Sequence, residues 1–250
     1  MRISIGFPAT KILYLLVFTC LIGLKLLDGA AWAQNVAGSL SQLTGGAQVQ
    51  RAGATINATQ GMAIDLHDRI STAPASSLTV TLTDGSALAM GASSTLSIDE
   101  NVVTGGTRQS TRVGLLGGSL RSLVSVALRG AVPNFEVQTP NAIAGVRGTD
   151  FEAVYSDGPT RPGMGGLTQF TDVAVHDGLV AVSSTAPENA GAPPELVPAG
   201  FETTVAGHLK PFPSGIIGMT GDSFTSAPPS VGAAPAPACP VCPACTVAAP

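Results

Sequence analysis

The residues best suited to chemistry in this 250-residue sequence are three cysteines near its C-terminus. Cys239, Cys242 and Cys245 have the Cys-x2-Cys-x2-Cys spacing of some metal and iron–sulfur ligand runs. No fourth ligand lies nearby, and the intervening prolines favour an extended chain. An exported chain with three cysteines leaves at least one for a bond to another molecule. The odd number of cysteines and the missing fourth ligand therefore favour an intermolecular disulfide over a metal site, and the remaining alternative is no special role.

The histidines and acidic residues give little indication of catalysis. His67, His176 and His208 lie in separate segments and lack the i, i+4 spacing of a helical zinc site. The sequence contains no nucleophile elbow, phosphate loop or dinucleotide fingerprint. Asp84 and Asp177 each precede a glycine, which is typical of turns. We therefore expect no catalytic residues, no cofactor and no metal site.

One charged set stands apart, Arg147 with Asp150 or Glu152. Gly145 and Gly148 bracket the arginine and allow the backbone a tight corner there. The five donors of the guanidinium can satisfy carbonyl groups at such a corner and pair with a carboxylate, which would lock the domain. The alternative is a contact with an anionic ligand or partner. We favour the structural role and expect Arg147→Ala to lower thermal stability.

The composition indicates a fold of short strands and turns. Hydrophobic residues make up 44% of the chain and charged residues 11%, which is enough apolar material for the core of one or two domains. Aromatic residues reach only 4%, whereas glycine and proline number 30 and 19. Small and β-branched side chains must therefore fill the interior.

The N-terminus predicts export. Arg2 and Lys11 precede an apolar run, Ile12–Leu24, and Ala31-Trp32-Ala33 has the form of a signal-peptidase site. We expect a signal peptide at residues 1–33 that is cleaved near Ala33, leaving no stable membrane span; a retained anchor is the alternative. The mature chain would then be periplasmic or secreted.

Charge narrows the choice of partners. Cleavage would remove Arg2, Lys11, Lys25 and Asp28, a net charge of +2, and would take the chain from −4 to −6. Lys210 is the single lysine that remains. Such a chain has no electrostatic footprint for nucleic acid or anionic lipid, so we expect protein, glycan or small-ligand partners.

The clearest strand is Leu78–Thr83, in which leucine and valine alternate with threonine. After Asp84-Gly85, a second run reaches Met90. A strict two-residue hairpin would place the apolar residues of the two runs on opposite faces. We therefore expect a bulged turn that sets Leu82 opposite Leu88 and Val80 opposite Met90, or else a corner between stacked rungs of a solenoid. The residues at 116–128 have partly helical spacing, but their glycines and valines favour a strand.

Residues 135–155 contain two runs with strand periodicity, separated by a central segment with a proline and two glycines. Thr139-Pro140-Asn141 ends the first run, because proline lacks the N–H that a strand ladder needs. We expect a turn between the two runs.

These residues resemble the signature of the FecR domain, a periplasmic β-rich module named after a regulator of ferric-citrate uptake. The likeness rests on Thr139-Pro140 and on Gly145, Val146, Arg147, Gly148, Thr149, Asp150 and Phe151. Asp68, Ile70 and Thr72 also occupy family-like places, and the resemblance runs from about Ala47 to about Lys210. It implies a non-enzymatic envelope module, in which the signature is structural or contacts a partner. Direct control of a sigma factor is not expected, because no anti-sigma segment precedes the apolar run.

The predicted organisation is a signal peptide (1–33), a lead-in (34–46), a FecR-like β domain (47–210) and a disordered Pro/Ala-rich tail (211–250). The expected fold is mainly β, a small solenoid or roll of short stacked strands, with a two-sheet sandwich as the alternative. We expect a binding or signalling module of the bacterial cell envelope, whose partner is an envelope protein or a cell-wall glycan. The alternative is a structural surface protein tethered through Cys239, Cys242 and Cys245.

Overall fold

The computed structural model describes residues 36–105, 107–125, 134–146, 148–158 and 160–216, which all lie in one compact unit that begins at Val36. Strands dominate these residues, and the helix among them is the short 3-10 helix η1 (Pro187–Asn189). No helix in this part of the chain is long and apolar enough to span a membrane. The mainly β fold that the sequence predicts is confirmed.

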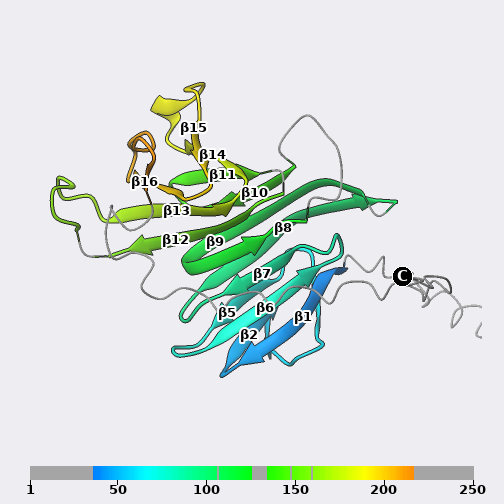
Figure 1. Cartoon of the computed structure of the whole chain (residues 1–250). Coiled ribbons are helices and arrows are strands. Elements are labelled where there is room, and N and C mark those ends of the chain that lie inside the picture. The colour runs from blue at the N-terminus through cyan, green and yellow to red at the C-terminus, as the bar shows by residue number, and fades with distance from the viewer. Residues whose placement is uncertain (1–35, 106, 126–133, 147, 159, 217–250) are drawn as a thin grey trace, which may run out of the picture. The chain divides into compact units, whose positions relative to one another are not determined.

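The strands form two sheets that share one strand (Figure 1). Sheet A contains, in spatial order, β4 (Ala63–Asp65), β1 (Val36–Thr44), β6 (Ser77–Leu82), β7 (Ala87–Met90), part of β9 (Thr107–Leu123), β12 (Asp150–Asp157), β13 (Gln169–Asp177), β16 (Phe201–Ala206) and β17 (Gly215–Ile216). Sheet B contains, in spatial order, β3 (Ala54–Asn57), β2 (Ala47–Arg51), β5 (Arg69–Thr72), β8 (Thr95–Thr104), the other part of β9, β10 (Phe135–Gln138), β11 (Ala142–Val146), β14 (Leu179–Ser184) and β15 (Glu195–Pro198).

Strand β9 passes from one sheet to the other. Its first part pairs with β8 and β10 in sheet B, and its last part, from Gly118 to Leu123, pairs with β7 and β12 in sheet A. The crossing lies at Gly118, where φ is +83° and an added Cβ would come within 2.6 Å of the Cα of Ser94. Only glycine adopts that backbone conformation freely and fits that close approach.

A single apolar core lies between the sheets. Alternate residues of each strand point into it, as a pleated strand requires. From sheet A it receives Leu78, Val80, Phe151 and Val173, and from sheet B it receives Ile70, Leu96, Phe135 and Val182, all at most 1% exposed. Full burial of one such side chain contributes about 1.5–3 kcal/mol, so this shared core is the main stabilising feature of the fold.

The chain repeatedly crosses from one sheet to the other, for example between β7 and β8, between β11 and β12, and between β13 and β14. These crossings stack the short strands into a two-layer roll. Neighbouring strands are antiparallel, except that β10 runs parallel to β9. The two strands around Asp177-Gly178 therefore lie in different sheets, and Gly178 forms a corner between them.

The hairpin of β6 and β7 differs in register from the prediction. Val80 lies opposite Leu88 and Leu78 lies opposite Met90, so the apolar residues share the core face as expected, but each pair is shifted. The loop has three residues, 83–85, and Gly85 has a φ of +82°. Gly85, the last residue of the loop, supplies the positive φ that this turn requires. The extra residue therefore lies in the loop, and the pairing of β6 with β7 continues without a bulge.

The limits of the folded unit and its central turn also differ from expectation. Residues 36–44, within the predicted lead-in, form β1, which pairs with both β4 and β6. The segment expected as a simple turn after Asn141 contains a further strand, β11, between β10 and β14. Strand β17 lies beyond Lys210, within the segment predicted as tail.

One arginine is buried inside the unit. Arg108 of β9 is 4% exposed, and its guanidinium binds the carboxylate of Asp84 in the β6–β7 turn. It also donates hydrogen bonds to the Ser86 hydroxyl at 2.9 Å, the Asn134 side chain at 3.1 Å and the Ser125 carbonyl at 3.1 Å. This charge is therefore compensated by partners from three segments, which a buried arginine requires.

Candidate functional site

The turn between β10 and β11 is locked by buried polar side chains. Thr139 and Asn141 are each 4% exposed. The Thr139 hydroxyl accepts a hydrogen bond from the Ala142 N–H at 2.9 Å and lies 2.7 Å from the Thr171 hydroxyl of β13. The Asn141 side chain accepts from Thr171 at 2.5 Å and donates to the Val205 carbonyl of β16 at 3.0 Å. The turn joins two strands of sheet B and is fixed to two strands of sheet A.

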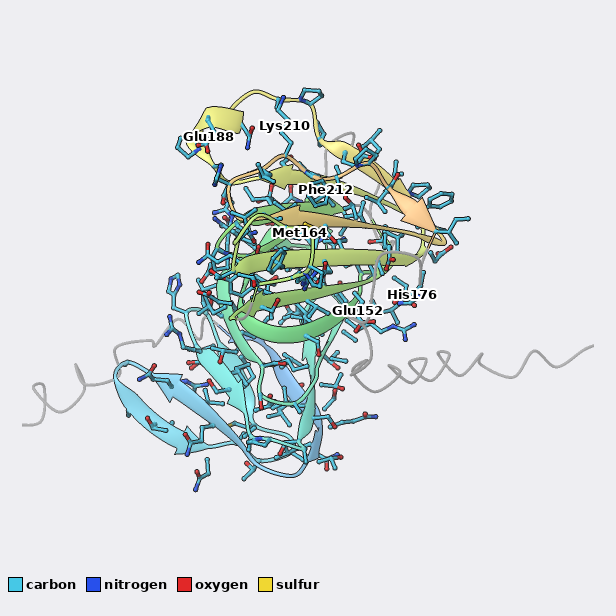
Figure 2. All side chains as sticks on the ribbon, turned by 90° about the vertical axis from the view of Figure 1, so that its left-hand side faces the viewer. Glu152, Met164, His176, Glu188, Lys210 and Phe212 are labelled. Atoms are coloured by element: carbon cyan, nitrogen blue, oxygen red, sulfur yellow. The ribbon has the colours of Figure 1, made fainter. Side chains whose placement is uncertain are left out.

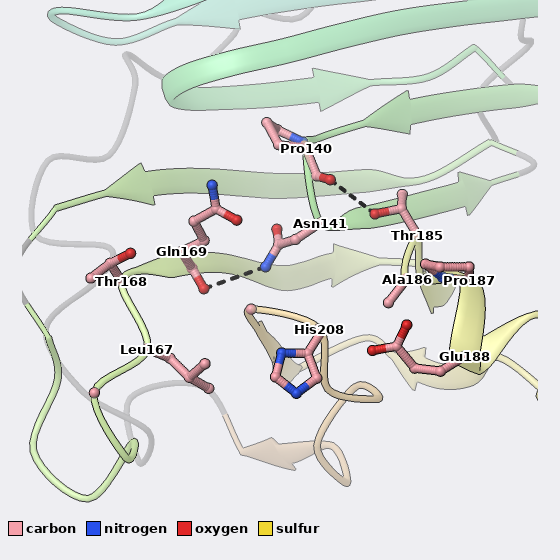
Figure 3. A pocket seen from close by; sticks show the side chains of 12 residues that line it. Pro140, Asn141, Leu167, Thr168, Gln169, Thr185, Ala186, Pro187, Glu188 and His208 are labelled. Carbon is pink, nitrogen blue, oxygen red and sulfur yellow. Dashed lines mark hydrogen bonds between the residues drawn. The ribbon is translucent and has the colours of Figure 1, made fainter.

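A pocket of about 500 Å³ lies beside this turn (Figure 3). That volume is within the range of small-ligand sites. Four segments form the walls: the turn, the loop before β13, the end of β14 with η1, and the residues after β16. The lining residues are Pro140, Asn141, Gly166, Leu167, Thr168, Gln169, Thr185, Ala186, Pro187, Glu188, Gly207 and His208.

Hydrogen bonds join these walls to one another. The Thr185 N–H donates to the Asn141 carbonyl at 3.1 Å, and the Thr185 hydroxyl donates to the Pro140 carbonyl at 2.9 Å. On another side, the Gly207 N–H donates to the Gln169 carbonyl at 2.7 Å. Because separate segments are tied together in this way, the pocket is preformed.

The rim of the pocket carries two polar side chains that the fold does not use. Glu188 of η1 and His208 after β16 are exposed, and neither side chain makes a hydrogen bond to another described residue. The side chain of Asn189 donates to the His208 carbonyl at 2.8 Å, which holds the two segments together. Figure 3 shows both side chains at the same side of the pocket.

The family-like signature follows the locked turn along the chain. Its residues occupy the end of β11, a corner and the start of β12: Gly145, Val146, Gly148, Thr149, Asp150 and Phe151. Arg147 lies outside the described residues, so its predicted ion pair stays a prediction. Cys239, Cys242 and Cys245 lie outside them as well.

The corner at Gly148 and Thr149 is packed into the domain. Thr149 is 4% exposed, and its carbonyl accepts a hydrogen bond from the Val124 N–H at 2.9 Å. Gly178, at the neighbouring corner, has a φ of +89°, and an added Cβ there would lie 2.6 Å from the Thr149 Cγ2. Phe151, the last signature residue, is fully buried. These contacts pack the corner and Phe151 into the domain, as a structural role of the signature would require.

The charged residues of β12 form a cluster on the outer face of sheet A. Arg121 of β9 donates to both carboxylate oxygens of Asp150, at 2.9 and 2.8 Å. Glu152 is 3% exposed, and its Oε1 has no hydrogen-bond partner among the described residues. Its Oε2 lies 3.8 Å from the Nε2 of His176, and Figure 2 shows these two side chains close together. Burial raises the pKa of Glu152 to about 7, and the Arg121 charge opposes this shift.

The described residues do not gather into a metal centre. No group of three His, Cys, Asp or Glu side chains in this part of the chain could hold a metal ion. The three histidines lie apart: His67 in the turn between β4 and β5, His176 near the end of β13, and His208 at the pocket.

Sequence reasoning missed the pocket. Glu188 and His208 are far apart in sequence from the turn at Asn141, and a single sequence does not show which loops meet. Thr139-Pro140-Asn141 is the one signal that pointed to this end of the domain, although it was interpreted only as the end of a strand.

Comparison with known proteins agrees with the signature. The model of the family described as FecR protein matches residues 68–181, from the residue before β5 into β14. No curated protein matches the chain. Two crystal structures of a candidate anti-sigma factor from Parabacteroides distasonis are similar, each with a TM-score of 0.42 and 16% identity over 62% of this chain. The chain spans 61% of that protein's length. Residues 68–181, with the signature corner in their midst, are therefore a FecR domain.

Proposed function

We propose that this chain is a non-enzymatic binding module with a signalling role in the bacterial cell envelope. In this proposal the chain is exported, the segment at residues 1–33 is removed near Ala33, and the mature protein is periplasmic or secreted. Its partner is an envelope protein or a cell-wall glycan. The FecR domain at residues 68–181 supports a regulatory role.

The main support for this proposal is the preformed pocket beside the turn between β10 and β11. A rigid concave site is suited to recognition, because little order is lost when a ligand enters it. A general base in an enzyme is usually oriented by a further group. The His208 imidazole has no such hydrogen bond among the described residues, so the rim is better suited to contact than to proton transfer.

The test is capture by the purified mature chain. The chain, residues 34–250, is incubated with purified peptidoglycan and, separately, immobilised and exposed to envelope extract, with the heat-unfolded chain as the control. We expect the folded chain to sediment with peptidoglycan or to retain a specific envelope protein. Equal retention by folded and unfolded chain in both assays would contradict the proposal.

The tail cysteines favour a second candidate, a surface protein held by intermolecular disulfides. Cys239, Cys242 and Cys245 are an odd number of thiols, so one is left for another molecule. Non-reducing electrophoresis of the protein from cells distinguishes this candidate. A band of higher mass that collapses to monomer with reductant is expected for tethering, and a band unchanged by reductant counts against it.

A further inference from the structure

We infer that the pocket beside the turn between β10 and β11 binds an uncharged sugar, as a mono- or disaccharide unit of a glycan. This inference rests on the proposed binding function and names the ligand class of the same site. Three observations carry it: the walls are fixed before any ligand arrives, the rim has polar side chains without hydrogen bonds to other described residues, and the described residues of the lining include no lysine or arginine.

The walls are fixed by contacts that need no ligand. The buried Asn141 amide ties the turn to β16, and the Thr185 hydroxyl ties the end of β14 to the turn. Leu167 packs beside Gly207, where φ is +52° and an added Cβ would lie 2.8 Å from the Leu167 Cδ2. Each hydroxyl group of a sugar gives up hydrogen bonds to water when it binds, so each contributes little net binding free energy. A site whose walls are already ordered loses less entropy on binding and is therefore an advantage.

The rim supplies hydrogen-bonding groups of the right kind. A carboxylate accepts hydrogen bonds from two hydroxyl groups at once, and an imidazole can donate from one nitrogen and accept at the other. Glu188 and His208 provide these groups on segments joined by the Asn189 side chain. The apolar side chains of Leu167 and Pro187 also line the pocket, where they can cover the C–H face of a sugar ring.

The charge of the lining argues against other ligands. An anionic ligand, such as a phosphate or a peptide carboxylate, would face the Glu188 carboxylate, and no lysine or arginine among the described lining residues would compensate. An extended peptide is usually recognised along a strand edge or a hydrophobic groove. The pocket is instead bounded by loops and a 3-10 helix.

The experiment is a titration of the isotope-labelled mature chain followed by NMR. The neutral probes are N,N′-diacetylchitobiose and maltose, and the charged probes are glucuronate and the peptide Ala-Pro-Ala. We expect at least one neutral saccharide to give saturable shifts at Thr168, Thr185 and His208, and neither charged probe to do so. No saturable shift with either neutral saccharide, or shifts confined to residues outside the pocket, would overturn the inference.

Matched variants sharpen the test. Glu188→Ala is expected to weaken saccharide binding about tenfold, since a hydrogen bond to a charged group is lost. Glu136→Ala removes a carboxylate of β10 that pairs with Arg112 away from the pocket, and it should leave the affinity unchanged. Both residues are on the surface, so both variants should fold. Equal affinity of the two variants would contradict a role for the rim.

Failure of this inference is distinguishable from failure of the proposed function. A chain that retains an envelope protein but gives no saccharide shifts is a binding module whose pocket does not take sugars. If the wild type and Glu188→Ala sediment equally well with peptidoglycan, the chain binds the cell wall through another surface. Either result would overturn the inference of a sugar site and would leave the proposed binding function in place.

Discussion

Strand β9 carries two arginines in contrasting surroundings, one near each end. Arg108 is 4% exposed, and its guanidinium bonds to Asp84, Ser86, Asn134 and Ser125. Arg121 lies on the outer face of sheet A with its side chain 24% exposed, and it pairs with Asp150. The buried cluster satisfies its groups fully, whereas the outer cluster leaves the Oε1 of Glu152 without a partner among the described residues.

The difference shows how one strand serves two purposes. A saturated buried charge joins segments and has little freedom to respond to its surroundings. A buried carboxyl group with an unused oxygen responds to pH instead, because its charged form is poorly solvated. Stability measurements on variants of the mature chain can test this contrast, since each of the two clusters predicts a different response.

The largest effect is expected at the buried cluster. Arg108→Ala leaves the Asp84 carboxylate buried without its partner, and we expect a loss of about 3–5 kcal/mol in the free energy of unfolding. Urea denaturation followed by circular dichroism measures it. The double variant Arg108→Met with Asp84→Asn should recover part of this loss. A cost below about 1 kcal/mol for Arg108→Ala would mean that the cluster is not as dry as its geometry indicates.

The next effect concerns Glu152 and pH. Its pKa in the folded chain, about 7, lies above the ordinary value of 4.5, so between these pH values the folded state holds a proton that the unfolded state releases. The contribution of Glu152 to stability is therefore fully present below about pH 4.5 and is lost as pH rises to about 7, a change of up to about 3 kcal/mol. Denaturation of the wild type and of Glu152→Gln across this range measures the difference. An identical pH dependence in both proteins would contradict it.

A smaller effect is expected for Arg121→Ala. The pair with Asp150 is partly exposed, so its loss should cost about 1 kcal/mol. The Arg121 charge also opposes the upward shift of the Glu152 pKa, and without it the fall in stability should extend to higher pH. Asp150→Asn is the matched variant that removes the pair but keeps the arginine. If stability stops falling at the same pH in Arg121→Ala and in the wild type, the Arg121 charge does not affect the pKa of Glu152.

The smallest effect is expected at a third arginine of the same strand. Arg112 is 44% exposed, and it lies 3.4 Å from both Glu100 and Glu136. Arg112→Ala should change the free energy of unfolding by no more than about 0.5 kcal/mol. Thermal denaturation at low and high salt provides the measurement. A change comparable to that of Arg108→Ala would show that exposure does not decide the ranking.

Sequence reasoning reached the fold class because side-chain alternation is a local signal. Leu78 and Val80 face the core as their spacing predicts, and the long strand β9 replaced a possible helix because Gly117 and Gly118 do not favour a helix. The predicted register of the β6–β7 hairpin was wrong. Its loop geometry depends on Gly85 taking a positive φ, and Asp84 is committed to Ser86 and Arg108.

The candidate site was harder to predict because it depends on contacts between distant segments. The sequence drew attention to Arg147 through its flanking glycines, whereas the buried arginine that the structure describes is Arg108. Nothing in the local sequence of Arg108 indicates burial, since its partners come from three other segments. The pocket rim at Glu188 and His208 is likewise assembled only by folding.

The crossing of β9 at Gly118 has a consequence for how the domain comes apart. The strand contributes hydrogen bonds to β7 and β12 on one side of the bend and to β8 and β10 on the other, so neither layer has a complete middle without it. Amides of both layers should therefore exchange with solvent in a single cooperative opening rather than as two separate halves. Loss of that one strand would dismantle the whole architecture at once.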